Sequence, residues 1–200
     1  ALSCNSDSSD TQDEGVNENH SKKEQKLIVE KNEKNTEQNQ QQPEIDEKFK
    51  VFLSKFAKVS LPYKENPTGN EAFGKIPIDE QVTYLSKPEK LSATDLNKMA
   101  DYTDFYYISN PLNTSMFHAI VYGRFEMGST YYFLCTYDND GNLISNIDFA
   151  AYELIGAGPQ AGQEYNTKGM IDKNFEITVK SDEELRKYKI QEDGKIVKID

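Results

Sequence analysis

His118 is the residue of this chain best suited to acid–base catalysis. A histidine can activate a nucleophile, and Ser115 and Cys135 are available in the same half of the chain. Neither residue lies in a segment that resembles the sharp turn on which a catalytic nucleophile is presented. Residues 116–125 are apolar on both alternating faces, which is typical of a central strand. The pattern therefore favours a packed histidine.

A pair of carboxylates is the other candidate, because two acidic side chains can hydrolyse a glycosidic bond. Five residues of the second half of the chain qualify by type: Asp101, Asp104, Glu126, Asp148 and Glu153. Their spacing selects no two of them, since an acidic chain offers many such pairs. A hydrolase that uses His118 or a carboxylate pair stays open as an alternative, and we predict no catalytic residue.

Three glycine-containing stretches resemble ligand-binding loops in part. Gly69–Lys75 matches the start of a phosphate-binding loop, but Ile76 and Pro77 stand where a hydroxyl residue and a helix are needed. Gly156–Gly162 has the wrong spacing for a dinucleotide loop, and Thr136–Gly141 lacks the glutamate that completes a calcium loop. We predict a surface loop, a flexible connection and a hairpin turn, with no cofactor and no metal.

The composition excludes several function classes. The chain has 200 residues, 34 of them acidic and 23 basic, with a net charge of −11. This balance argues against nucleic-acid binding, which needs clustered lysines and arginines. Two histidines and two cysteines make a zinc site or a disulfide-rich scaffold improbable. No apolar run approaches the roughly 18 residues of a membrane-spanning helix.

The distribution of aromatic residues divides the chain. All 10 phenylalanines and 12 tyrosines lie at or after Phe49. Ordering a residue costs about 1–2 kcal/mol of backbone entropy, which a segment without aromatic residues offsets poorly. We therefore predict a disordered acidic and polar tether over residues 1–44 and a single α+β domain over residues 45–200.

The domain is predicted to begin with one or two helices. Apolar residues recur with helical spacing, ending at Leu61-Pro62: Ile45, Phe49, Phe52, Leu53, Phe56 and Val59. A second helix is expected over Ala93–Ala100, with Ser92 and Asp95 as a capping box. Between the two helices, one short strand is expected at Gln81–Leu85.

Strand patterns fill the rest of the chain. Eight segments are rich in β-branched and aromatic residues: Phe105–Ser109, Met116–Glu126, Thr130–Tyr137, Leu143–Tyr152, Gln163–Ile171, Phe175–Lys180, Arg186–Gln191 and Lys195–Ile199. Turn residues separate several of them, and Asp-Gly pairs favour type I′ hairpins. The predicted fold is therefore α+β, with the helices followed by a curved antiparallel β-meander or a partly open barrel.

The first residues, Ala1-Leu2-Ser3-Cys4, lack an initiator methionine and are followed by a short run of serines and aspartates. This start resembles that of a Bacteroidetes lipoprotein, in which a cysteine is lipidated and becomes the mature N-terminus. The acidic stretch is similar to the export signal of surface lipoproteins in that group. The resemblance implies a signal peptide, lipidation at Cys4, and an extracytoplasmic domain anchored to the outer membrane or cell surface of a Gram-negative bacterium.

The domain also resembles uncharacterised lipoproteins of the Bacteroidetes cell envelope. The segments that carry this resemblance are Leu61-Pro62, 132–144, 169–172, 188–190 and 193–196. Their motifs are those of hairpins. The resemblance therefore implies a location and a fold, and no reaction.

Three hypotheses for the function follow. The first is a non-enzymatic envelope domain that binds a protein or glycan partner, since tyrosines near the predicted strands combine apolar contact area with a polar tip. The second is an inhibitor or immunity protein whose acidity suits a basic hydrolase such as lysozyme. The third is the hydrolase considered above. A tyrosine-lined groove, a protruding acidic loop or a deep pocket at His118 would distinguish them.

Overall fold

The computed structural model describes residues 44–68 and 73–199. They belong to a compact unit that spans residues 41–200. Cys4 and the predicted tether, except for Glu44, lie outside the described residues. Within the described ranges, no helix has the length and apolar character needed to cross a bilayer.

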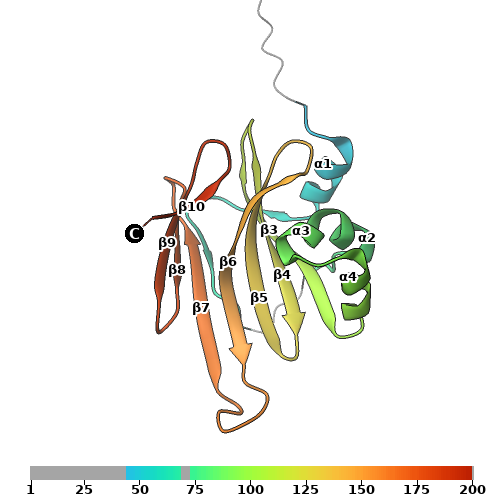
Figure 1. Cartoon of the computed structure of the whole chain (residues 1–200). Coiled ribbons are helices and arrows are strands. Elements are labelled where there is room, and N and C mark those ends of the chain that lie inside the picture. Colours follow the sequence, from blue (N-terminus) through green and yellow to red (C-terminus); the bar gives the residue numbers. More distant parts are fainter. Residues whose placement is uncertain (1–43, 69–72, 200) are drawn as a thin grey trace, which may run out of the picture. The chain divides into compact units, whose positions relative to one another are not determined.

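Short helices come first along the chain and strands dominate the rest (Figure 1). The helical elements are α1 (Glu47–Ser54), α2 (Ile78–Glu80), the π-helix η1 (Gln81–Leu85), α3 (Ser86–Glu89) and α4 (Ala93–Met99). The strands are β1 (Ala57–Lys58), β2 (Tyr63–Glu65), β3 (Thr103–Asn113), β4 (His118–Glu126), β5 (Ser129–Tyr137), β6 (Leu143–Leu154), β7 (Glu164–Ile171), β8 (Glu176–Lys180), β9 (Leu185–Ile190) and β10 (Ile196–Ile199). The structure is mostly β-sheet after its short helices, and this sheet is open. The eight predicted strands correspond to β3–β10.

The sheet is mixed, because β1 pairs in parallel with β3 while β3 to β10 pair antiparallel in sequence order. Strand β7 joins two parts of this sheet. Its first half pairs with the end of β6. Its second half, from Gly169 to Ile171, lies between β8 and the early strand β2. A Cβ at Gly169 of β7 would lie 2.6 Å from the backbone oxygen of Phe149 on β6. Only glycine therefore permits the close approach of these two strands.

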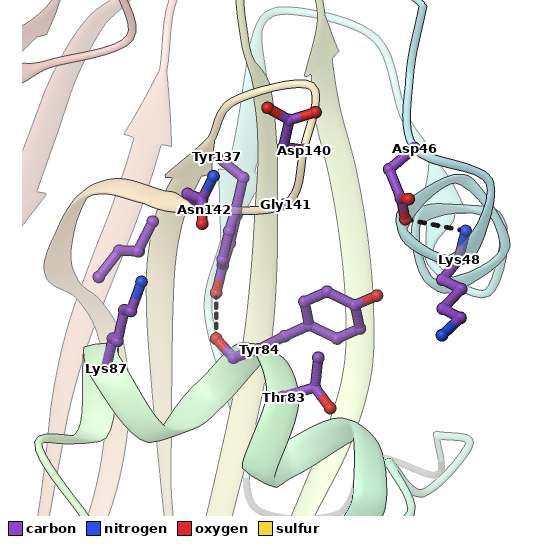
Figure 2. Close-up of a pocket in the computed structure, with 10 residues that line it drawn as sticks. Asp46, Lys48, Thr83, Tyr84, Lys87, Tyr137, Asp140, Gly141 and Asn142 are labelled. Carbon is purple, nitrogen blue, oxygen red and sulfur yellow. Dashed lines mark hydrogen bonds between the residues drawn. The ribbon is translucent and has the colours of Figure 1, made fainter.

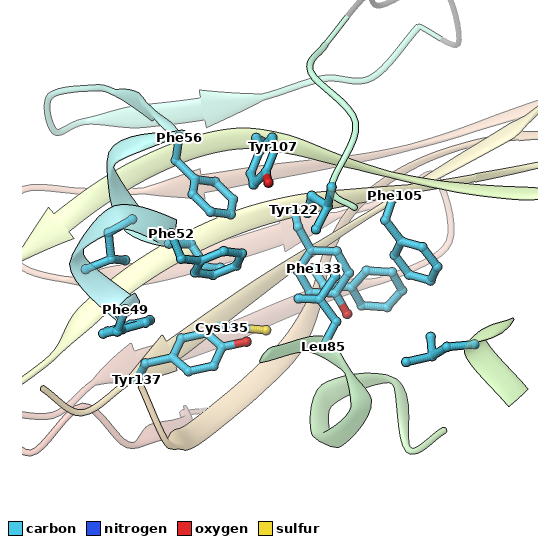
Figure 3. Close-up of a cluster of buried hydrophobic side chains, with 14 residues drawn as sticks. Phe49, Phe52, Phe56, Leu85, Phe105, Tyr107, Tyr122, Phe133, Cys135 and Tyr137 are labelled. Atoms are coloured by element: carbon cyan, nitrogen blue, oxygen red, sulfur yellow. The ribbon is translucent and has the colours of Figure 1, made fainter. Parts of the chain in front are cut away.

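Alternating side chains of β3–β5 supply two hydrophobic cores, one on each face. On one face, Ile120, Tyr122 and Cys135 pack under aromatic residues of α1 and under Leu85 and Leu96 (Figure 3). On the other face, residues such as Val121 and Leu134 pack against apolar residues of β7–β9. Strand β4 is therefore apolar on both faces, as its sequence predicted.

A buried ion pair fastens the helices to the sheet. Glu89 of α3 has a side chain only 2% exposed, and its carboxylate binds the guanidinium of Arg124 on β4. The hydroxyl of Tyr122 donates to the same carboxylate at 2.6 Å. The Arg124 guanidinium also lies over the rings of Tyr131 and Phe133, 5.3 Å and 5.1 Å from their centroids. The pair is thus held by charge, hydrogen bonding and ring contacts together.

Two predictions about the first helices are wrong in detail. The helix predicted to continue to Val59 ends at Ser54, because the following residues form β1 and pair with the edge of β3. The predicted strand Gln81–Leu85 is a π-helix within a continuous helical segment. Its buried residues, Gln81 and Leu85, are four apart, and the Gln81 amide donates to the Ile76 carbonyl at 2.8 Å. Burial on one helical face therefore overrides the strand propensity of these residues.

The second predicted helix, α4, has the expected capping box between Ser92 and Asp95. The type I′ geometry expected at Asp-Gly pairs is absent at Gly141 and Gly194, where only the glycine has a positive φ. Both central residues have positive φ instead at the β4–β5 turn, Met127 and Gly128.

Candidate functional site

A pocket of about 250 Å³ lies where α1, the helical segment 78–89 and the β5–β6 turn meet (Figure 2). Ten residues from these three parts of the chain line it: Asp46, Lys48, Thr83, Tyr84, Lys87, Tyr137, Asp140, Gly141, Asn142 and Leu143. Most of them are polar or charged. The pocket is therefore suited to a small hydrophilic ligand.

The start of α1 forms one wall of the pocket. Asp46 is the N-cap of this helix, and its carboxylate accepts hydrogen bonds from the backbone N–H groups of Lys48 and Phe49 at 3.0 Å and 2.9 Å. The backbone N–H of Asp46 donates to the carbonyl of Asn139 in the β5–β6 turn at 2.9 Å. The cap thus fixes the helix and also ties it to the opposite wall.

The β5–β6 turn forms that opposite wall. One carboxylate oxygen of Asp138 accepts from the backbone N–H groups of Asp140 and Asn142 at 3.0 Å and 2.8 Å. Gly141 has a φ of +78°, and a Cβ there would lie 3.0 Å from the ring of Phe49. The predicted hairpin turn is confirmed. No cluster of three metal-ligating side chains occurs among the described residues, here or elsewhere.

Tyr84 provides the aromatic surface of the pocket. Its ring stacks on Phe52, with centroids 4.2 Å apart, and its backbone carbonyl accepts from the hydroxyl of Tyr137 at 2.8 Å. Figure 2 shows the ring between α1 and the β5–β6 turn. Burial, and then the charges of Asp46 and Glu80, raise the pKa of Tyr84. Its hydroxyl therefore remains protonated at neutral pH and is available as a hydrogen-bond donor.

The charges that line the pocket are balanced and available. Lys48, Lys87 and Asp140 have exposed side chains. Among the described residues, no ion pair includes any of the three. A ligand with several hydroxyl or amide groups would find both donors and acceptors at this position.

His118 lies beneath the pocket wall and does not form a nucleophile–base pair. Its side chain is buried, and its ring nitrogens contact the amide oxygens of Asn113 at 2.8 Å and Asn139 at 2.9 Å. The amide nitrogen of Asn139 donates in turn to the backbone carbonyl of Ser115 at 3.1 Å. Cys135 is fully buried, and this burial raises the pKa of its thiol. The structure therefore places His118 as a support of the β5–β6 turn.

The predicted carboxylate candidates are dispersed over the sheet. Asp104 pairs with Lys75 at 2.7 Å, and Glu126 lies 3.7 Å from Arg124. Asp101 and Asp148 are exposed, and Glu153 is half-buried on β6. None of the five lines the pocket.

The two other glycine stretches differ in how much of each the structure describes. Gly69–Lys75 is described only from residue 73, and Lys75 makes an isolated bridge with Tyr106 of β3. Gly156–Gly162 forms the exposed connection between β6 and β7. The prediction of a connection between two strands at Gly156–Gly162 is confirmed, whereas residues 69–72 lie outside the described residues.

Sequence reasoning missed the pocket as a site, because its walls come from three distant segments. Tyr84 was hidden in a segment whose composition predicts a strand. The Asp46 cap before the apolar spacing of α1 was a usable signal.

Comparison of the chain with protein-family models, curated proteins and solved structures found no match.

Proposed function

We propose that the domain binds carbohydrate and that an N-terminal lipid tether holds it at the outer membrane or cell surface of a Gram-negative bacterium. The observation that carries the binding proposal is the ring of Tyr84, which is stacked on Phe52 within a polar pocket. A sugar ring has an apolar face of C–H groups and a rim of hydroxyls. A fixed aromatic ring surrounded by carboxylate, amide and ammonium groups matches both.

The size of the pocket limits the ligand. Its volume of about 250 Å³ is below the roughly 300–1,000 Å³ of sites for drug-sized ligands. One sugar residue, at the end of a chain that continues into solvent, suits this volume. The balanced charges of Lys48, Lys87, Asp46 and Asp140 favour a neutral sugar over a strongly charged one.

Tyr84→Ala is expected to weaken glycan binding at least tenfold, because it removes the apolar surface on which the sugar stacks. The ligand is first selected on an array of bacterial and host glycans, and its Kd is then measured by calorimetry. Tyr84→Phe keeps the ring and is expected to bind within about threefold of the wild type.

Two further variants separate recognition from folding. Lys87→Ala and Asp140→Asn alter exposed lining side chains and should weaken binding, with the melting temperature unchanged. Lys173→Ala, exposed and outside the pocket, is the matched control. An array without a bound glycan, or Tyr84→Ala binding as tightly as the wild type, would refute the proposal.

The tether proposal rests on the lipoprotein-like residues Ala1-Leu2-Ser3-Cys4 and on the polar composition of residues 1–44. A coil of 40 residues has a root-mean-square reach of roughly 35 Å, enough for the domain to sample ligands around its anchor. Acyl chains contribute about 0.8 kcal/mol per buried CH₂, so multiple acylation retains such a domain on a membrane.

Cys4→Ser is expected to abolish incorporation of a metabolic acyl label when the full-length gene is expressed in its host. Cys135→Ser, which removes the chain's other cysteine, should keep the label. The readout is label per molecule of protein in a gel band. A Cys4→Ser protein labelled as strongly as the wild type would contradict lipidation at this cysteine.

We also propose that the sheet curves into a partly open barrel. Two contacts support it. The hydroxyl of Thr136 on β5 donates to the carbonyl of Gly194 at 2.7 Å. A Cβ at Gly194 would lie 2.9 Å from both Ile144 and Phe117. The turn before β10 therefore returns towards β5, β6 and the start of β4.

A further inference from the structure

A second surface lies at the other end of β5 and β6. The β6–β7 connection, residues 155–163, extends farther from the sheet than the neighbouring β4–β5 turn (Figure 1). Its base is closed by hydrogen bonds from the Ile155 N–H to the Gln163 carbonyl at 3.0 Å and from the Gly162 N–H to the Ile155 carbonyl at 2.7 Å. Residues 156–165 are all exposed. The connection is thus a protruding loop on a hydrogen-bonded base.

The glycines of this loop are not required by packing within the domain. Among the glycines of the described residues, only Gly156, Gly158 and Gly162 have nothing within 4 Å of an added Cβ. Gly156 also lacks the positive φ that would favour glycine. A glycine that neither conformation nor neighbours require leaves bare backbone at the surface. Bare backbone permits the close approach of another molecule.

Exposed apolar side chains lie beside the loop. Met127 is 87% exposed and Tyr102 is 56% exposed, and strand register places both at this end of the sheet. Tyr165 is exposed at the start of β7. A Cβ on Gly128 would contact Leu154, so the β4–β5 turn adjoins the end of β6. Such a group of apolar side chains around a protrusion is typical of a protein-binding surface.

The charge of this region indicates the kind of partner. Four acidic residues lie at this end of the sheet, whereas Asp104 is paired with Lys75. Arg124 is the one basic residue of strands β3–β6. Arg124 is already paired with Glu89. Asp101, Glu126, Glu153 and Glu164 lie at or near the strand ends around the protruding loop. A neutral tip within an acidic border is complementary to a cleft with a basic rim.

We propose that the loop 155–163 inserts into the cleft of a basic protein, with the acidic strand ends pairing with the rim of that cleft. This interaction is separate from glycan binding, because the pocket lies at the opposite end of β5 and β6. A domain of this kind can hold a glycan at one end and a protein at the other. If the partner is a hydrolase, insertion of the loop blocks its cleft.

The test compares the wild-type chain with a variant in which residues 156–162 are replaced by Asn-Gly, a two-residue hairpin turn. These residues are exposed, so the variant is expected to keep the melting temperature of the wild type. Both proteins are immobilised and exposed to an extracytoplasmic extract of the host and its surroundings. Any protein retained only by the wild type is purified, and its Kd is measured at low and high salt.

The expected partner has a basic isoelectric point and binds the shortened variant at least tenfold more weakly. Raising the salt from 50 to 300 mM should weaken its binding to the wild type. Gly156→Trp should reduce binding without altering stability, because Gly156 is exposed and an added Cβ there has no neighbour within 4 Å. Tyr84→Ala should retain this interaction, which separates it from glycan binding. A partner that is acidic, salt-insensitive or equally retained by the shortened loop, or the lack of any differential partner, would overturn the proposal.

Discussion

Arg124→Met is expected to lower the free energy of unfolding by about 3–5 kcal/mol, because it leaves the carboxylate of Glu89 buried without a compensating charge. The Glu89 side chain is 2% exposed, whereas Arg124 is 22% exposed. The hydroxyl of Tyr122 remains as a donor to the carboxylate but carries no charge. The measurement is urea unfolding of the purified domain, followed by circular dichroism.

The double variant Arg124→Met/Glu89→Leu is the matched control. Replacing both partners with apolar side chains removes the buried charge, so the double variant should recover most of the stability lost in Arg124→Met. Glu89→Leu alone should be less destabilising than Arg124→Met, since the remaining arginine is partly exposed. If Arg124→Met unfolds within about 1 kcal/mol of the wild type, the pair behaves like a surface ion pair and its assigned role is wrong.

Gly169→Ala is expected to destabilise the domain by about 2–3 kcal/mol through overpacking. The added methyl group would lie 2.6 Å from the Phe149 carbonyl oxygen and 2.7 Å from the Phe149 ring. Because both the backbone and the buried ring of Phe149 are this close, there is little room for relaxation. Thermal and urea unfolding of the variant measure the effect.

Gly156→Ala provides the comparison for this substitution. Gly156 has no neighbour within 4 Å of an added Cβ and no positive φ. Alanine there should be neutral or stabilise the domain by up to about 1 kcal/mol, because it reduces the freedom of the unfolded chain. Equal stabilities for the two alanine variants would show that β7 and Phe149 are not in close contact.

Strand prediction succeeded where a local pattern and burial agree. Alternating apolar residues on β4 and β5 face two cores, so apolar residues typical of a central strand occur along most of both sequences. Strands β1 and β2 were not predicted, because they contain only two and three residues and owe their pairing to β3 and β7. The segment Gln81–Leu85 was wrongly predicted as a strand, because its β-branched and aromatic residues are typical of strands. The helical spacing of its two buried residues can be seen only in the structure.

The candidate site was less predictable than the fold. Asp46 and Asp138 had recognisable local roles, as a helix cap and as a turn residue. Tyr84 and Lys87 join them only through packing of a helix on the far side of a long loop. No spacing rule connects residue 46, residue 84 and residue 140. The protruding loop was visible as a glycine-rich connection, but its exposure and acidic surroundings required the strand register.

The pairing of β2 with β7 has a consequence for the order of assembly. Tyr63 of β2 lies opposite Ile171 of β7, more than a hundred residues further along the chain. The hairpins from β3 to β6 close short loops and gain their contacts early, whereas long-range pairing waits for distant chain to be brought together. The molecule is therefore expected to assemble from its middle outwards, with β2 docking among the last.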